Sequence, residues 1–87
     1  MEKAYRVYLV RCRDGTLYCG YTVDISRRLR AHNAGLGAKY TRSRLPVTLA
    51  YLEQLPSKSA ALRRENELKK LSRAQKEALI GGLSAPG

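Results

Sequence analysis

At the start of the chain, hydrophobic and polar residues follow the pattern of β-strands. Residues 5–12 and 17–21 are rich in aromatic and β-branched side chains, and short runs of this kind are typical of strands. Between them lies Arg13-Asp14-Gly15-Thr16, which has the composition of a turn. The start of the chain therefore predicts a β-hairpin.

A helical pattern follows the hairpin. Thr22 and Asp24 are suited to open a helix, because their side chains can accept hydrogen bonds from free backbone N–H groups. The sequence Asn33-Ala34-Gly35 is suited to close it. The next segment, 36–46, combines glycine with several basic residues and predicts a flexible loop. Bulky apolar residues over 47–53 predict a third strand.

Two more helices are expected in the last third of the chain. Ser57 or Ser59 can cap the first of them, which runs to about Leu71. Residues 72–75 have the spacing of a capping box, and this predicts a second helix that ends at the glycines 81–82.

These elements give the order ββαβαα. The predicted fold is of the α/β (α+β) class, with a small, three-stranded, mainly antiparallel sheet flanked by helices. We expect a single domain over 1–82 and a flexible tail over 83–87. A length of 87 residues leaves no room for a second core, because domains usually have roughly 100–200 residues.

The charge of the chain favours a polyanionic partner. There are 17 lysines and arginines against 7 acidic residues, a formal net charge of +10, and such a balance is common in nucleic-acid-binding proteins. No acidic residue occurs between Asp24 and Glu53. The candidate nucleic-acid-binding residues in this interval are Arg27, Arg30, Lys39, Tyr40, Arg42 and Arg44. A basic face that is merely solvated is the alternative.

Other classes of protein are disfavoured. No uncharged stretch approaches the roughly 20 apolar residues that span a bilayer, and no secretory signal is visible at the N-terminus. We therefore expect a cytoplasmic protein with no membrane partner. Cys12 and Cys19 suit neither a disulfide framework nor a zinc site, which needs about four ligands. We interpret both as small core or strand residues.

One acidic residue stands out in the helix predicted after 57. At about 100° per residue, Ala61, Leu62, Glu65 and Leu68 share one stripe, so Glu65 is expected among core-facing side chains. A buried carboxylate is costly unless a partner compensates its charge. A divalent cation or a buried arginine would do so, and the sequence leaves both open.

The first predicted helix places Asp24, Arg28 and His32 four residues apart on one stripe. Asp24 and Arg28 could form a simple helix-supporting pair, with His32 partly exposed at the helix end. Alternatively, Arg28 could clamp a phosphate with both arms of its guanidinium, and His32 could relay or accept a proton at neutral pH.

Several of these residues together resemble a known family. The sequence contains Val7-Tyr8, Tyr18-Cys19-Gly20, Asp24, Arg28, His32-Asn33 and Glu65 followed by Leu68-Lys69-Lys70. In order and spacing they resemble the GIY-YIG nuclease domain. The chain looks most similar to its small stand-alone bacterial branch, relatives of the N-terminal module of the nucleotide-excision-repair incision subunit. It departs from the family pattern at Arg6, where the first glycine is expected, and at Cys19, where an aliphatic residue is usual.

The resemblance implies phosphodiester hydrolysis with a single divalent cation, Mg²⁺ or Mn²⁺. Glu65 would bind the metal ion and Arg28 would neutralise charge in the transition state. Tyr8 or Tyr18 would position or deprotonate the attacking water, and His32 would assist through a hydrogen bond. These roles suit the reaction, because phosphodiester cleavage depends mainly on charge stabilisation and positioning.

A single site of this kind sets a condition on the hairpin. A two-residue loop at 14–15 would place Tyr8 and Tyr18 on opposite faces of the sheet. A three-residue loop, 13–15, with Gly15 in the left-handed conformation, would place both tyrosines on the same face. We predict the three-residue loop or another loop of odd length.

Two functions follow from the sequence. The first is a metal-dependent endonuclease, acting on DNA rather than RNA and selective for branched or nicked structures or only weakly specific. The alternative is a nucleic-acid-binding module on the same fold that cleaves poorly or not at all. Because there is no room for a specificity domain, a homodimer or a protein partner would supply target recognition.

Overall fold

The computed structural model of the protein describes residues 4–81. Within this range the chain forms one three-stranded sheet, made of β1 (Tyr5–Arg11), β2 (Leu17–Thr22) and β3 (Thr48–Leu55). The strands lie in the order β2-β1-β3, and both neighbouring pairs are antiparallel. The expected tail, and the end of the domain expected at residue 82, lie outside the described residues.

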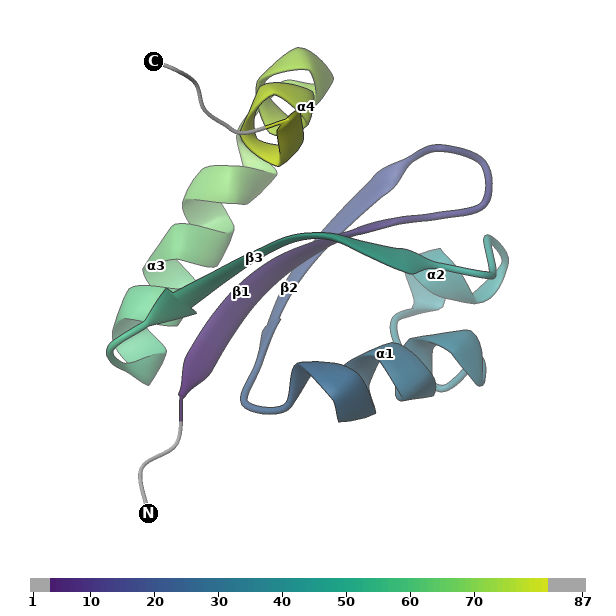
Figure 1. Cartoon of the computed structure of the whole chain (residues 1–87), viewed down its shortest axis with the longest axis horizontal. Helices are drawn as coiled ribbons and strands as arrows, with labels where there is room; N and C mark the ends of the chain where they lie inside the picture. The colour runs from purple at the N-terminus through teal and green to yellow at the C-terminus, as the bar shows by residue number, and fades with distance from the viewer. Residues whose placement is uncertain (1–3, 82–87) are drawn as a thin grey trace.

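Two pairs of helices flank the sheet. The helices are α1 (Ile25–Asn33), α2 (Lys39–Arg42), α3 (Lys58–Lys69) and α4 (Arg73–Gly81). Figure 1 shows α1 and α2 on one side of the sheet and α3 and α4 on the other. The α+β class and the antiparallel sheet predicted from the sequence are confirmed. No helix within residues 4–81 has both the length and the apolar character of a membrane span.

The hairpin has the predicted three-residue loop. The backbone N–H of Cys12 donates to the carbonyl of Thr16 at 2.8 Å, and Gly15 has a φ of +88°. This left-handed conformation favours glycine, because it has no Cβ to clash with the backbone. In the resulting register Tyr8 is opposite Gly20 and Val10 is opposite Tyr18. Tyr8 and Tyr18 therefore share a face of the sheet, as predicted.

Helix capping also follows the sequence. The Asp24 carboxylate accepts from the backbone N–H of Arg27 at 3.1 Å and begins α1. Ser57 caps α3 in the same way. At α4 the capping box is complete, because Ser72 and Gln75 each accept from the other's backbone N–H.

The prediction of a flexible loop over 36–46 was wrong. The segment contains α2, whose residue Thr41 is fully buried. The Thr41 hydroxyl donates to the carbonyl of Ala38 at 3.0 Å and closes this single turn. Periodicity missed the turn because its buried residue is polar and is held by hydrogen bonds rather than by apolar packing.

Each face of the sheet has its own small core. Val7, Leu9 and Cys19 pack with Ala61 and Leu68 under α3. On the other face, the buried residues are Tyr8, Val10, Cys12 and Val47, with Ile25 and Leu29 of α1 packed against them. Both cysteines are buried and free, one in each core, as the sequence predicted.

The predicted core stripe of α3 is only partly correct. Ala61 and Leu68 are fully buried, but Leu62 is 39% exposed. Arg64 lies beside the sheet, where its guanidinium donates to the carboxylate of Glu53 on β3 at 2.9 Å. The helix packs on the sheet through Ala61 and Leu68, and Leu62, about 100° around the helix from Ala61, falls outside that contact.

Candidate active site

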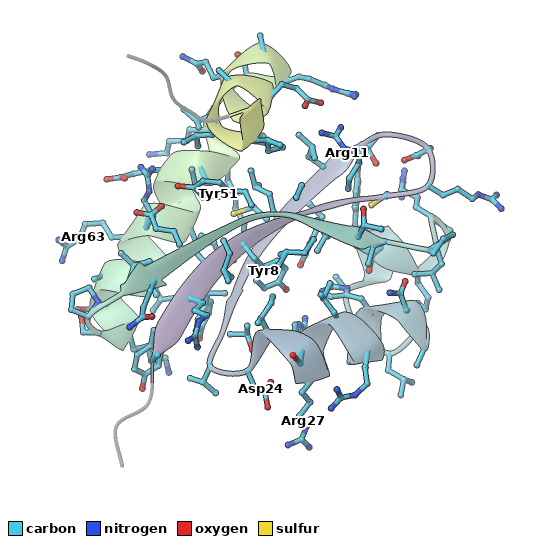
Figure 2. The ribbon with its side chains drawn as sticks, in the orientation of Figure 1. Tyr8, Arg11, Asp24, Arg27, Tyr51 and Arg63 are labelled. Atoms are coloured by element: carbon cyan, nitrogen blue, oxygen red, sulfur yellow. The ribbon has the colours of Figure 1, made fainter. Side chains whose placement is uncertain are left out.

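The centre of the candidate site is the phenol of Tyr8, which lies between the sheet and α1 (Figure 2). Tyr8 points from the central strand and is only 1% exposed. Its ring lies over Gly20 on β2: a Cβ at Gly20 would come within 2.5 Å of the Tyr8 hydroxyl. Glycine at this position therefore makes the space that the tyrosine fills.

Two residues of α1 bind the Tyr8 hydroxyl. The Nε of Arg28 donates to it at 3.2 Å, and the Nε2 of His32 lies 3.0 Å from it. A helix-supporting pair between Asp24 and Arg28 is therefore not what the structure contains. His32 is fully buried, so the alternative of a partly exposed histidine at the helix end was wrong. The tertiary contact with Tyr8 holds both side chains under the sheet.

The far side of the His32 ring is also enclosed. Its Nδ1 lies 2.9 Å from the hydroxyl of Thr41 on α2. A Cβ at Gly37 would overlap Nδ1 and the adjacent ring carbons, so only glycine fits there. The next residue of α1, Asn33, bonds both the N–H and the carbonyl of Val47 and ties the helix to the chain entering β3.

Burial sets the protonation of this cluster. Burial raises the pKa of Tyr8 above its ordinary value, while the hydrogen bond and the charge of Arg28 act in the opposite direction. Burial lowers the pKa of His32, and the positive charge of Arg28 lowers it further. At neutral pH the cluster therefore consists of a neutral phenol, a neutral imidazole and a charged guanidinium.

Arg28 is fixed at one end and free at the other. Its Nε is engaged by Tyr8, whereas its two terminal nitrogens have no hydrogen-bond acceptor among residues 4–81. Arg28 lines a hollow of about 250 Å³ beside Thr22, Asp24, Arg27 and Ala31. A guanidinium presented in this way can bind two oxygens of one phosphate.

Tyr18 lies on the same face but is less deeply buried than Tyr8. The edge of its ring meets His32 at 5.7 Å between centroids, and its face stacks on Tyr40 at 5.8 Å. The guanidinium of Arg44 lies 4.0 Å from the Tyr40 ring centre and also bonds Asp14 at the hairpin tip. The Tyr18 hydroxyl makes no hydrogen bond with any residue that the structure describes.

The other candidate binding residues are on the surface of α1 and α2. Arg27, Arg30, Lys39 and Arg42, hereafter the basic surface, are all exposed. None of them forms an ion pair within the described part of the chain. In Figure 2 Arg27 points away from α1 into solvent. Arg44 differs from them, because its charge is partly neutralised by Asp14.

Glu65 is separated from the tyrosine and arginine cluster. It lies on α3, against the opposite face of the sheet, where its backbone carbonyl accepts from the Cys19 thiol of β2. Burial, and next the negative charge of Glu65, raise the pKa of this thiol to about 11. Cys19 follows Tyr18 along β2, an outer strand of the sheet. Glu65 and Tyr18 therefore approach the same edge of the sheet from its two faces.

The partner of the Glu65 carboxylate is not an arginine. Its side chain is 15% exposed, and the ion pair it forms is with Lys69, at 3.3 Å, whose side chain is 53% exposed. The nearby Arg64 is already engaged by Glu53 and Glu67, which raises the pKa of its guanidinium. Arg64, the arginine that could have given Glu65 a purely structural role, thus pairs with other carboxylates.

Comparison with known proteins identifies this arrangement. The family model described as the GIY-YIG catalytic domain matches residues 4–78. The chain belongs to the GIY-YIG family. The resemblance drawn from the tyrosine motifs, Arg28 and Glu65 is therefore confirmed at the level of the family.

The relatives and solved structures are proteins of the UPF0213 group and similar small chains. The UPF0213 protein of Halobacterium salinarum is 61% identical over 87% of this chain and 99% of its own length. The UPF0213 protein of Staphylococcus haemolyticus is 54% identical over 92% of this chain and 96% of its own length. The solution structure of a Bacillus halodurans UPF0213 protein is 47% identical, with a TM-score of 0.58 over 90% of this chain and 83% of that one. The solution structure of a protein of E. faecalis is 44% identical, with a TM-score of 0.61 over 87% of this chain and 81% of that one.

GIY-YIG nuclease domains generally use a divalent metal ion, and Glu65 suits such an ion. Within residues 4–81 no three His, Cys, Asp or Glu side chains form a cluster, so the three or four protein ligands of a zinc site are not assembled. Mg²⁺ differs, because it is commonly held by one or two carboxylates together with water and substrate phosphates. A mostly buried carboxylate with one surface lysine as its partner fits that requirement.

Sequence reasoning missed the residues that enclose this GIY-YIG site. Thr41 lies in the segment predicted to be a loop, and Gly37 carries no side chain that could signal a role. Both are recognisable only once His32 is known to be buried against them. The one available signal was the glycine pair 35 and 37 directly after the His32-Asn33 motif.

Proposed function

We propose that the protein is a metal-dependent nuclease that hydrolyses phosphodiester bonds in DNA. The observation that carries the proposal is the state of Arg28. Its Nε is held by a buried tyrosine, while its terminal nitrogens are unpaired among the described residues beside a hollow. A surface arginine that served only solubility would need no such anchor, whereas an arginine that must meet a phosphate in one orientation benefits from it.

Arg28 and Glu65 would share the work of charge stabilisation. Arg28 would bind two non-bridging oxygens of the scissile phosphate and oppose the charge that grows there in the transition state. Glu65 is the residue that would hold the divalent cation. When bound, Mg²⁺ or Mn²⁺ would supply Lewis-acid polarisation of the phosphate and stabilisation of the leaving oxygen.

The two tyrosines are given different roles. Tyr8 is buried and its hydroxyl is engaged by Arg28 and His32, so we assign it to holding the arginine in place. Tyr18 is only half-buried, and its hydroxyl is unpaired among the described residues. We therefore assign Tyr18 to the attacking water, which its hydroxyl would position or deprotonate.

The basic surface supports nucleic acid as the substrate. Its four side chains lie on α1, which also carries Arg28 and His32, and on the adjacent α2, and none forms an ion pair within residues 4–81. Such residues would contact the phosphate backbone without reading sequence. We propose that branched, nicked or otherwise irregular DNA is preferred, and that a second copy of the chain or another protein supplies target selection.

The alternative function is binding without efficient cleavage. It is favoured by one observation: Glu65, the carboxylate assigned to the metal ion, contacts Lys69 and Cys19 rather than the tyrosine and arginine cluster. Both functions use the same basic surface, so binding measurements alone cannot separate them.

Cleavage of a panel of labelled substrates separates the two functions. Single-stranded, duplex, nicked and branched DNA, together with RNA, would be incubated with Mg²⁺, with Mn²⁺ and with EDTA. The wild type is expected to cut DNA only when the metal is present, and Arg28→Ala is expected to lose that activity. Arg63→Ala, an exposed arginine of α3 that points away from the site (Figure 2), is the matched control and should cut like wild type. Binding without cleavage under every condition would favour the binding module.

A further inference from the structure

Thr41 is a buried polar residue without a role in the mechanism proposed above. It has no exposed surface, and its hydroxyl oxygen lies 2.9 Å from Nδ1 of His32 and 3.0 Å from the carbonyl oxygen of Ala38. It shares the short helix α2 with two members of the basic surface, Lys39 and Arg42. Thr41 is therefore the buried residue of an element whose other side faces the expected substrate.

The direction of each hydrogen bond follows from the available donors and acceptors. A carbonyl oxygen only accepts, and the Thr41 hydroxyl donates to that of Ala38, which also accepts from the backbone N–H of Arg42 at 3.2 Å. With its proton on that side, the Thr41 oxygen accepts from Nδ1 of His32, which then carries a proton. In a neutral imidazole the other nitrogen, Nε2, then has a free lone pair and accepts the Tyr8 hydroxyl proton. The Tyr8 oxygen in turn accepts from Nε of Arg28.

The other neutral tautomer of His32 fits poorly. With the proton on Nε2, the Tyr8 oxygen would face two donors, Nε2 and Arg28, and its own proton would have no partner in a side chain that is 1% exposed. To bond the lone pair of Nδ1, the Thr41 hydroxyl would also have to turn its proton away from the Ala38 carbonyl. Buried polar atoms left unpaired in this way are costly.

We propose that Thr41 is a positioning residue that fixes His32 in the tautomer protonated at Nδ1. In this tautomer His32 holds the Tyr8 proton, and the Tyr8 oxygen is left to anchor Arg28. Thr41 thereby acts on the phosphate-binding arginine through two intervening side chains. The effect on catalysis rests on the proposed function, whereas the tautomer is a property of the folded chain and can be tested without it.

The placement of Thr41 also links substrate binding to the site. A DNA backbone held by Lys39 and Arg42 would contact the same single turn that carries Thr41. Any shift of that turn would move the acceptor for Nδ1 of His32. The backbone of Gly37 also packs directly against the His32 ring, which is possible because glycine has no Cβ.

Nuclear magnetic resonance can read the tautomer directly, because His32 is the only histidine in the sequence. Long-range ¹H–¹⁵N spectra of the wild type at neutral pH are expected to show Nδ1 as the protonated nitrogen and Nε2 as the bare one. Thr41→Val keeps the shape of the side chain but removes the hydroxyl, and should move the ring toward the Nε2-protonated form. Thr41→Ser should keep the wild-type pattern, as should Thr48→Val, which changes an exposed threonine on β3.

Kinetics on the DNA that the wild type cuts best give the second readout. Thr41→Val is expected to lower kcat by about 10- to 100-fold with little change in KM, because a small misplacement of a catalytic group is enough for such a loss. Thr41→Ser is expected to restore most of it. If Thr41→Val fails to fold, the spectra of the wild type and of Thr41→Ser still decide the tautomer.

The possible results separate this inference from the proposed function. A wild-type ring protonated at Nε2, or a folded Thr41→Val protein with an unchanged ring spectrum, overturns the inference whether or not the protein cuts DNA. If no DNA is cut under any condition but the ring responds to Thr41→Val as expected, the positioning of His32 stands and the nuclease proposal fails.

Discussion

The contact between Tyr8 and Gly20 allows a sharp test of how the site is built. In Gly20→Ala the new Cβ would lie 2.5 Å from the Tyr8 hydroxyl and 2.8 Å from the ring carbon that bears it. Neither distance is tolerable between non-bonded atoms. Tyr8 cannot move aside easily, because it is 1% exposed and is bonded to Arg28 and His32.

The expected cost can be worked from these contacts. Overpacking a well-filled core costs about 1–3 kcal/mol, and breaking the two hydrogen bonds of Tyr8 costs about 1 kcal/mol each. Replacing a glycine inside a strand returns about 0.5–1 kcal/mol. The net loss for Gly20→Ala is therefore about 2–4 kcal/mol. In a domain of this size that lowers Tm by about 10–25 °C.

Thermal unfolding of four proteins measures this loss. They are the wild type, Gly20→Ala, Tyr8→Phe and the double variant. Tyr8→Phe removes the closer of the two clashing atoms but keeps the ring carbon, so Gly20→Ala should cost less in that background without becoming neutral. Gly81→Ala is the control: apart from its chain neighbours and its own helix backbone, no atom of residues 4–81 lies within 4 Å of the new Cβ, and stability should stay equal or rise slightly. A Gly20→Ala protein within about 0.5 kcal/mol of wild type would refute the reasoning.

Two further predictions concern the basic surface and the buried histidine. Arg42→Ala should weaken DNA binding about equally for all sequences. Because one phosphate contact is lost, the slope of log affinity against log salt concentration should also become shallower by about one. Arg63→Ala should leave this slope unchanged, and equal slopes for wild type and Arg42→Ala would contradict the assignment. In the folded protein the pKa of His32 lies below its ordinary value of 6.5, so below pH 6.5 the unfolded chain binds more protons than the folded one. The contribution of the neutral His32 to the free energy of unfolding should therefore be fully present above pH 6.5 and decline as the pH falls below it. Urea unfolding at about pH 7.5 and about pH 5.5 should therefore show a loss in wild type that shrinks in His32→Gln, and a flat wild-type profile would contradict the buried neutral imidazole.

Local chemistry predicted the helix caps at Asp24 and at Ser72, because capping depends on residues only a few positions apart. The hairpin register was predicted in another way, from the condition that Tyr8 and Tyr18 belong to one site and share a face. The φ of +88° at Gly15 shows how the turn achieves it.

The parts that failed depend on contacts between distant segments. One of the two alternatives for His32 was a partly exposed helix end, but the hydroxyls of Tyr8 and Thr41 enclose the ring from two sides. Leu62 was expected in the core stripe of α3 but is 39% exposed, because the helix meets the sheet through Ala61 and Leu68. No periodicity within one segment carries that information.

Of the site residues taken from the family resemblance, the structure brings four together and places the fifth elsewhere. The structure brings Arg28, His32 and Tyr8 into direct contact and places Tyr18 against His32. It places Glu65 across the sheet, with Lys69 as its ion-pair partner. The metal-binding role of Glu65, the cytoplasmic location and the preference for DNA are predictions for experiment.

The most direct test of the account compares Glu65→Gln with Glu67→Gln. Each replaces one carboxylate of α3 by an amide of the same shape. Glu67→Gln removes an exposed ion pair with Arg64, and Glu65→Gln removes the pair of a mostly buried carboxylate with the half-exposed Lys69. Since a buried amide costs less than a buried charge, both proteins should fold. Glu67→Gln is expected to cut DNA in Mg²⁺ like wild type. Glu65→Gln is expected to lose cleavage by about 100-fold or more, while binding DNA as tightly as wild type or slightly more tightly, since one negative charge is gone. Equal cleavage by the two variants, or a Glu65→Gln chain that does not fold, would contradict a metal-dependent nuclease centred on Glu65.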